Sequence, residues 1–167
     1  METQPPFDFN LGLNKLNELI KGIKIAMLTT VSKDLTLHSS PLLAQEIEFD
    51  GDLWFLISKN SQKAEDLRNN HHVCICYAAG AKYVSITGTA DLVEDTEKVQ
   101  ELWHKTYQAW FPKGIQDPTI QLLRINVEKA EFWEGHSMPV MSVLEFMNAA
   151  TGGHIKMGEH GELNLKQ

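Results

Sequence analysis

The sequence predicts a mainly β protein, an antiparallel barrel or sandwich with peripheral helices. Apolar, β-prone segments follow one another at short spacing between residues 23 and 133, and turn residues separate them. Only one helix is expected among the first five of these segments, between residues 23 and 93, so strands and helices do not alternate as a parallel sheet requires. The chain also lacks a G-x-G-x-x-G fingerprint and a phosphate-binding Walker loop, which argues against a doubly wound nucleotide fold.

An amphipathic helix is expected first, because leucines recur at helical spacing over residues 10–21 and Gly22 follows. The β-prone segments come next, at residues 23–30, 35–49, 53–57, 72–77, 83–93 and 120–133. The first two flank turn residues at 32–34 and are predicted to form a hairpin. In the fifth, Gly88 indicates a bulge or bend.

Two further helices are expected between the strands, at residues 61–69 and 95–107. Asp95 and Thr96 are candidate caps of the second, while Pro112 and Gly114 prevent its continuation and leave Trp110 on a loop. We also expect a flexible N-terminus at 1–9, a short apolar helix at 140–148 and a polar, glycine-rich, mobile tail at 149–167. Residues 10–148 would then form a single domain.

The length, charge and cysteine content of the chain limit the number of domains, the class of partner and the cellular compartment to be expected. The chain has 167 residues, which suits one domain, and a net charge of −7, which disfavours binding to nucleic acid or to anionic lipid. No apolar run has transmembrane length, and the first ten residues lack the basic start and apolar core of a signal peptide. With only two cysteines, the sequence favours a protein of the reducing cytoplasm.

The segment from Asp50 to Lys63 is the most informative. It is predicted to run from an Asp-Gly turn through a strand into a helix start. Helix N-termini offer unpaired N–H groups, and here Ser58, Ser61 and Lys63 add hydroxyls and an ammonium, which together would suit a phosphate. The alternative is an ordinary helix start, capped by Ser61 and with Lys63 in solvent.

A second set of polar residues, Ser39 and Ser40 before Pro41, falls in an otherwise apolar strand. If the second and third strands pair, these hydroxyls lie near Lys63 and complete a site for a phosphate and a ring. The alternative is that they are exposed residues on a sheet edge.

Metal and hydrolytic chemistry are not expected. His72, Cys74 and Cys76 share one strand face, but residues two apart on a strand lie about 6–7 Å apart, too far to converge readily on one ion. We therefore expect both cysteines to be buried in the core. No G-x-S-x-G elbow is present, no residue is assigned a catalytic role, and the C-terminal histidines are expected in solvent.

Taken together, several motifs resemble the general stress protein 26 family of pyridoxamine 5'-phosphate oxidase-like, FMN-binding split barrels. They are Ala26-Met27-Leu28-Thr29-Thr30, Leu37-His38-Ser39-Ser40-Pro41, Gly51-x-Leu53-Trp54-Phe55-Leu56-x-Ser58-x-x-Ser61-x-Lys63, Tyr83-Val84-Ser85-Ile86-x-Gly88-x-Ala90, Ala109-Trp110-Phe111-Pro112-x-Gly114 and Ala130-Glu131-Phe132-Trp133. They occur in order over nearly the whole chain up to Trp133.

The resemblance implies a six-stranded antiparallel split β-barrel of Greek-key type that forms a homodimer, with one FMN in each of two clefts between the subunits. Ser61 and Lys63 match the positions at which this family binds the flavin phosphate. Trp133 matches a tryptophan that, in the family, reaches the flavin ring from the other subunit. The full set of cofactor-binding residues that the resemblance implies is Ser39, Ser40, Pro41, Leu56, Ile57, Ser58, Ser61, Gln62, Lys63, Tyr83, Trp110 and Trp133.

Two positions depart from the family. Ser40 replaces an arginine of the His-Ser-Arg-Pro motif, which would reduce flavin affinity. Residues 134–139 replace the short Arg/His motif with which true oxidases hold their substrate phosphate, so pyridoxamine 5'-phosphate oxidase activity is not expected. The resemblance thus implies a flavin-dependent oxidoreductase of unknown substrate or, alternatively, a non-catalytic module that binds or stores flavin.

Overall fold

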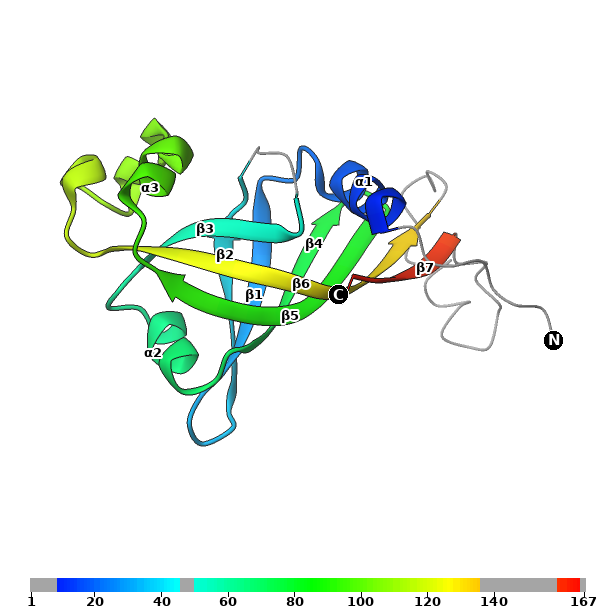
Figure 1. Cartoon of the computed structure of the whole chain (residues 1–167), viewed down its shortest axis with the longest axis horizontal. Helices are drawn as coiled ribbons and strands as arrows, with labels where there is room; N and C mark the ends of the chain where they lie inside the picture. Colours follow the sequence, from blue (N-terminus) through cyan, green and yellow to red (C-terminus); the bar gives the residue numbers. More distant parts are fainter. Residues whose placement is uncertain (1–8, 46–49, 136–158, 166–167) are drawn as a thin grey trace, which may run out of the picture.

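Seven strands form one antiparallel sheet in a computed structural model that describes residues 9–45, 50–135 and 159–165 (Figure 1). Six of them follow the order β2-β1-β4-β5-β6-β3, and β7 pairs with β6 outside this path. The strands are β1 (Ile25–Val31), β2 (Leu37–Leu43), β3 (Asp52–Ser58), β4 (His72–Ala79), β5 (Lys82–Val93), β6 (Ile120–Glu134) and β7 (Glu159–Asn164). The prediction of a mainly β, antiparallel fold with peripheral helices is confirmed.

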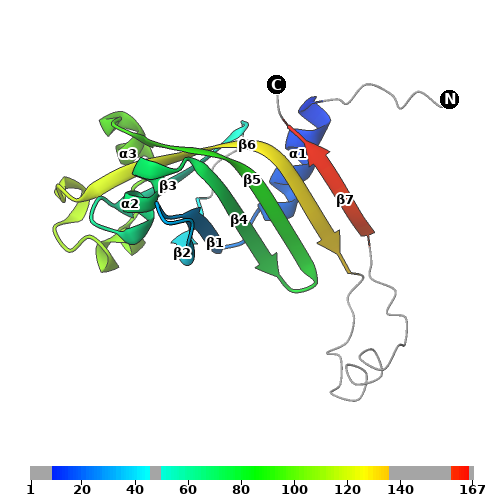
Figure 2. The same ribbon diagram turned by 90° about the horizontal axis from the view of Figure 1, so that it is seen from below.

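The helices lie outside the sheet, and none in the described part is long and apolar enough to cross a bilayer. They are α1 (Phe9–Ile20), α2 (Gln62–Asn69) and α3 (Thr96–Leu102). Of these, α1 packs against β5, and its residues Leu16 and Leu19 are buried in the main core (Figure 2). This helix, α2 and five of the six expected strands were predicted from the sequence to within a few residues. The strand expected at 35–49 is shorter, because β2 ends at Leu43, and residues 46–49 lie outside the described part of the chain.

Two elements differ from the predictions. The helix expected at 95–107 ends at Leu102, and two short 3₁₀ helices follow, Lys105–Ala109 and Gly114–Gln116. The second difference is β7, which forms within the predicted tail and inserts Leu165 into the core beside it. The helix expected at 140–148 lies outside the described residues.

The bulge predicted at Gly88 is confirmed. The β5–β6 register shifts between Thr87 and Gly88. At Gly88 a Cβ atom would lie 2.0 Å from the carbonyl oxygen of Asn126, so only glycine allows the two strands to approach this closely.

The cysteines are not in the core, so that prediction was wrong. Cys74 is half-buried and Cys76 is exposed, because β4 buries its other face through Val73, Ile75 and Tyr77. Alternation fixes which residues share a face, and the larger apolar side chains decide which face turns inward. No group of three or more metal-ligating side chains occurs among the described residues.

The second and third strands do not pair, contrary to the hypothesis drawn from the sequence. β2 pairs with β1 and β3 pairs with β6, so they are the two ends of the hydrogen-bonded order. The curved sheet nevertheless brings them into contact across the gap between those ends. This gap is where the main candidate site lies.

Candidate functional site

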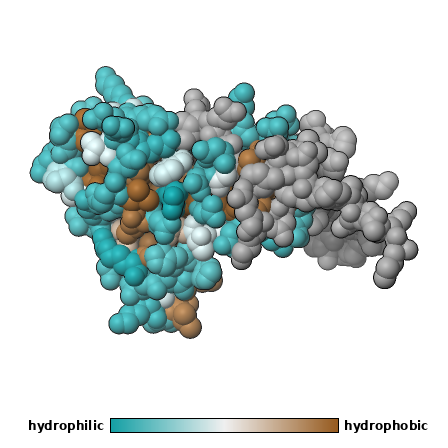
Figure 3. Space-filling view, viewed as in Figure 1, coloured by the Kyte–Doolittle hydropathy of each residue, from teal (hydrophilic) through white to brown (hydrophobic). Residues whose placement is uncertain are grey.

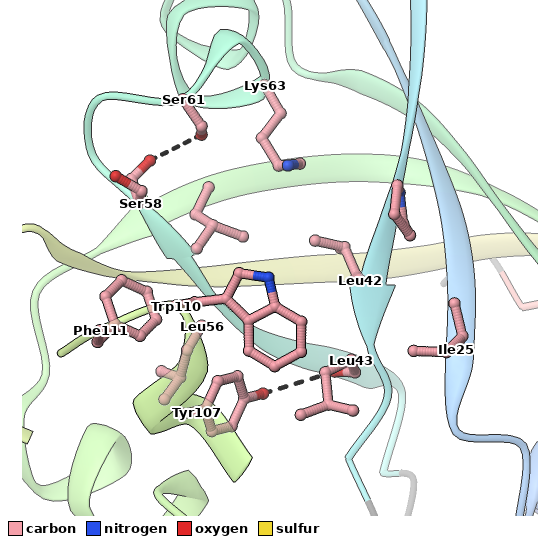
Figure 4. Close-up of a pocket in the computed structure, with 12 residues that line it drawn as sticks. Ile25, Leu42, Leu43, Leu56, Ser58, Ser61, Lys63, Tyr107, Trp110 and Phe111 are labelled. Atoms are coloured by element: carbon pink, nitrogen blue, oxygen red, sulfur yellow. Dashed lines mark hydrogen bonds between the residues drawn. The ribbon is translucent and has the colours of Figure 1, made fainter. Parts of the chain in front are cut away.

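A pocket of about 330 Å³ opens between the β2 and β3 ends of the sheet, within the usual size range of small-ligand sites. The β1–β2 side contributes Ile25 and residues 41–43, and β3 contributes residues 56–58. The start of α2 closes one end of the pocket and the first 3₁₀ helix with the residues after it closes the other (Figure 4). In the space-filling view, apolar surface shows in the hollow between α2 and the α3 end of the molecule (Figure 3).

Ser61 is the N-cap of α2. Its Oγ accepts a hydrogen bond from the backbone N–H of Ala64 at 3.3 Å and donates one to the carbonyl oxygen of Ser58 at 2.7 Å. The hydroxyl is therefore already engaged in the local structure, as the capping interpretation predicted. The backbone at this helix start still carries the positive end of the helix dipole.

Lys63 lines the same end of the pocket and is half-buried rather than solvated. Burial lowers the pKa of its ammonium. Within the described part of the chain, Lys63 makes no hydrogen bond or ion pair, and in Figure 4 its ammonium points from α2 into the space between Ser58 and Leu42. A half-buried cation without a counter-charge is costly alone and favours an anion in the pocket.

Three aromatic residues form the opposite end: Tyr107 and Phe111 are buried, whereas Trp110 is 59% exposed. The Tyr107 hydroxyl donates to the carbonyl oxygen of Leu43 at 3.5 Å and accepts a close hydrogen bond from Gln45. Burial raises the pKa of Tyr107 to about 12, so the hydroxyl stays neutral at physiological pH. Trp110 lies between the two walls, where its ring can cover a flat ligand (Figure 4).

The pocket gathers many of the residues singled out from the sequence. Those that line it are Pro41, Leu56, Ile57, Ser58, Ser61, Lys63 and Trp110. Those that do not are Ser39, Ser40, Gln62, Tyr83 and Trp133. Gln62 donates instead to Asp66 at 2.9 Å, and Ser39 shares a hydrogen bond of 2.6 Å with Thr29.

Tyr83 and Trp133 lie opposite one another in the β5–β6 ladder, near the end of β6. The pocket lies beside the start of β6, where Ile120 pairs with Ser58. The two aromatic residues are thus separated from the pocket of their own chain by most of the length of this strand.

Sequence reasoning missed five lining residues: Ile25, Leu42, Leu43, Tyr107 and Phe111. They carry no polar motif. Leu42 and Leu43 directly follow Pro41, and Tyr107 and Phe111 flank Trp110, so extending those segments would have found them. Ile25 could not have been found in this way, because it lines the pocket only as the partner of Leu43 in the β1–β2 ladder.

The pocket continues onto an exposed apolar surface. Ile25 lines the pocket, and Met27, two residues along β1, is 43% exposed on the same strand face. Met27 lies in register with Pro41 on one side and Cys76 on the other, and Tyr83, which is 53% exposed, lies further across the sheet on β5. We refer to Ile25, Met27, Cys76 and Tyr83 as the outer face. An exposed apolar surface of this kind is typical of an interface.

Chemically, the site suits a ligand with a flat apolar part and an anionic end. Lys63 and the α2 N-terminus would take the anion, and the apolar walls with Trp110 would take the flat part. The ionisable side chains among the lining residues are Lys63 and Tyr107, so the described pocket offers neither a carboxylate nor an imidazole for proton transfer.

Comparison with known proteins gives consistent results. Residues 12–156 match the family model described as pyridoxamine 5'-phosphate oxidase like. General stress protein 26 of Bacillus subtilis (strain 168) is 32% identical over 89 residues, which cover 50% of this chain but only 63% of that protein, less than two thirds of its length.

Solved structures show the same fold. A candidate general stress protein 26 from Jannaschia sp. CCS1 has a TM-score of 0.70 and 19% identity, over 94% of this chain and 99% of that one. A general stress FMN/FAD binding protein from Xanthomonas citri has a TM-score of 0.66 and 25% identity, over 80% and 96% of the two chains. The split-barrel fold implied by the sequence resemblance is therefore confirmed.

Proposed function

The chain belongs to the pyridoxamine 5'-phosphate oxidase-like family, and we propose that it is an FMN-binding protein of the general stress type. The observation that carries this proposal is Lys63, a half-buried cation without a counter-charge in the described chain, at one end of an apolar pocket. A flavin mononucleotide matches both ends, because a phosphate fits beside Lys63 and an isoalloxazine ring fits between the apolar walls and Trp110. The description of the Xanthomonas citri structure as an FMN/FAD binding protein supports the same class of ligand.

The protein's part in such a complex is binding and orientation. Lys63 neutralises phosphate charge, the backbone N–H groups at the start of α2 donate hydrogen bonds to the phosphate oxygens, and Trp110 limits access of water to the ring. A bound flavin supplies hydride and electron transfer chemistry. We propose that Trp133 of the other subunit closes the cleft, since it does not line the pocket of its own chain.

The direct test is a visible absorption spectrum of the purified protein, followed by titration with FMN. We expect either flavin absorbance on purification or saturable quenching of FMN fluorescence in the apoprotein. A colourless protein that does not bind added FMN would contradict the proposal.

A non-catalytic flavin-binding or storage module is the second candidate. Two observations favour it: the pocket offers no carboxylate or imidazole in the described chain, and Glu134 stands where the oxidases begin their substrate motif. Glu134 is held by Lys15 at 3.0 Å. Anaerobic titration of the flavin-bound protein with NADH or NADPH separates the two. Rapid bleaching of the flavin band indicates an oxidoreductase, and no bleaching indicates the binding module.

We also propose that the protein acts in the cytoplasm as a homodimer whose interface includes the outer face. Replacing Met27, in the middle of that face, with lysine should convert the dimer to monomers and weaken FMN binding, because a charge would be buried at the interface. Sedimentation measures the mass. As the matched control, Leu35→Lys changes a residue that is 76% exposed at the β1–β2 turn and should leave a dimer. A wild-type protein that sediments as a monomer would contradict the dimer.

The two roles considered for Ser61 can be separated by substitution. Ser61→Ala should lower the free energy of unfolding by about 1 kcal/mol, because the cap of α2 is lost. Ser61→Asp keeps a capping side chain and should retain near wild-type stability, but it places a carboxylate at the phosphate end and should sharply weaken FMN binding. Urea unfolding and FMN titration measure the two effects. Undiminished FMN binding by Ser61→Asp would show that the phosphate lies elsewhere.

A further inference from the structure

Asp66 lies on the buried face of α2, one helical turn after Lys63. Although it is charged, only 1% of it is exposed. Three donors from three elements hold its carboxylate. The Thr30 hydroxyl on β1 donates to Oδ2 at 2.7 Å, and the His38 Nδ1 on β2 donates to the same oxygen at 2.8 Å. The Gln62 side-chain amide on α2 donates to Oδ1 at 2.9 Å.

These hydrogen bonds keep the carboxylate charged. Burial raises the pKa of Asp66, but the hydrogen bonds from Gln62, His38 and Thr30 outweigh burial, so that the pKa lies below its ordinary value. A full negative charge therefore lies on the same short helix as the proposed phosphate anchor.

Residues three apart on a helix are neighbours, so an aspartate at 66 would ordinarily pair with a lysine at 63. The described chain contains no such ion pair, and Lys63 is instead left available in the pocket. Whether Asp66 pairs with Lys63 depends on the orientation of its carboxylate. Thr30 on β1 and His38 on β2 hold Oδ2, and Gln62 on α2 holds Oδ1.

We propose that His38, together with Thr30 and Gln62, positions the Asp66 carboxylate away from Lys63 and thereby keeps the lysine available for an anionic ligand. The inference rests on the proposed function in so far as the ligand is a flavin phosphate. His38 is a positioning residue here, since it does not line the pocket. Its hydrogen bond also links β2, which carries one pocket wall, to α2, which closes the pocket at its phosphate end.

The experiment compares FMN with riboflavin, which has the same ring but no phosphate, in the full-length protein. His38→Leu removes the donor and should weaken FMN binding about tenfold, equivalent to about 1.4 kcal/mol, while changing riboflavin binding less than about twofold. His38→Asn retains an N–H donor at the δ position and should restore FMN binding. Adding Asp66→Asn to His38→Leu should also restore it, because no carboxylate remains to compete with the phosphate for Lys63.

Unchanged FMN affinity in His38→Leu would overturn the inference while leaving the proposed function intact. Equal losses of FMN and riboflavin affinity without rescue by Asp66→Asn would overturn it too, because they would indicate a purely structural role. If His38→Leu does not fold, the single variant Asp66→Asn decides: it should bind FMN at least as tightly as the wild type, and weaker binding contradicts the inference. A wild type that binds neither flavin rejects the proposed function itself and the inference with it.

Discussion

Replacing Lys63 with alanine is expected to weaken FMN binding by roughly 1–3 kcal/mol, about a fivefold to 150-fold rise in the dissociation constant. The reason is that Lys63 is the cation that lines the pocket and, in the described chain, it has no competing partner. A phosphate bound there would lose a charged hydrogen bond and would remain beside a helix terminus only. FMN fluorescence quenching measures the change.

The specificity of this effect can be checked in two ways. Riboflavin affinity should hardly change in Lys63→Ala, since riboflavin has no phosphate. Lys59→Ala is the matched control, because Lys59 lies near the same helix start but does not line the pocket and pairs with Glu94 at 3.4 Å. A dissociation constant for FMN that is the same in Lys63→Ala and in the wild type would show that Lys63 is not the phosphate anchor.

Replacing Gly88 with alanine is expected to destabilise the fold by about 3 kcal/mol, at the upper end of the range for overpacking. The added Cβ would lie 2.0 Å from the Asn126 carbonyl oxygen, a backbone atom that cannot rotate away. The β5 and β6 strands would have to separate at the bulge, in the most extensive ladder of the sheet. For a chain of this size the melting temperature should fall by about 6–12 °C.

Thr87→Ala is the control for this experiment, because Thr87 is the exposed neighbour of Gly88 on the same strand. It should change stability by less than about 1 kcal/mol. Thermal unfolding of both variants by circular dichroism gives the comparison. A Gly88→Ala variant as stable as Thr87→Ala would mean that the two strands are not in close contact at this point.

Much of the fold was predictable because it follows from local signals. Alternation and turn residues located six strands, helical spacing located α1, and the serine cap located the start of α2. Gly88 indicated the bulge, since a glycine within a strand is favoured where two backbones approach closely. Each of these signals acts over a few residues.

Other features were missed for identifiable reasons. The cysteines were assigned to the wrong face because alternation leaves the choice of the inner face open, and the β4 core is formed by Val73, Ile75 and Tyr77. β7 was missed because its residues lie among glycines and polar residues, and its pairing with β6 supplies most of its stabilising contacts. The pairing expected between β2 and β3 was wrong, although both strands do contribute to one pocket.

The sequence by itself determined six of the seven strands, the helix start at Ser61 and the bulge, which depend on residues close together in the chain, and the family resemblance, which depends on the order of short motifs. Only the tertiary structure decided that β2 and β3 meet as unpaired sheet ends, that Tyr107 and Phe111 join Trp110 in the pocket, and that Asp66 turns toward His38 and leaves Lys63 available. The physical reason is the separation along the chain over which each interaction acts. Propensity and capping act within a few residues, whereas packing of the whole sheet fixes the strand register and the contacts between side chains far apart in the chain.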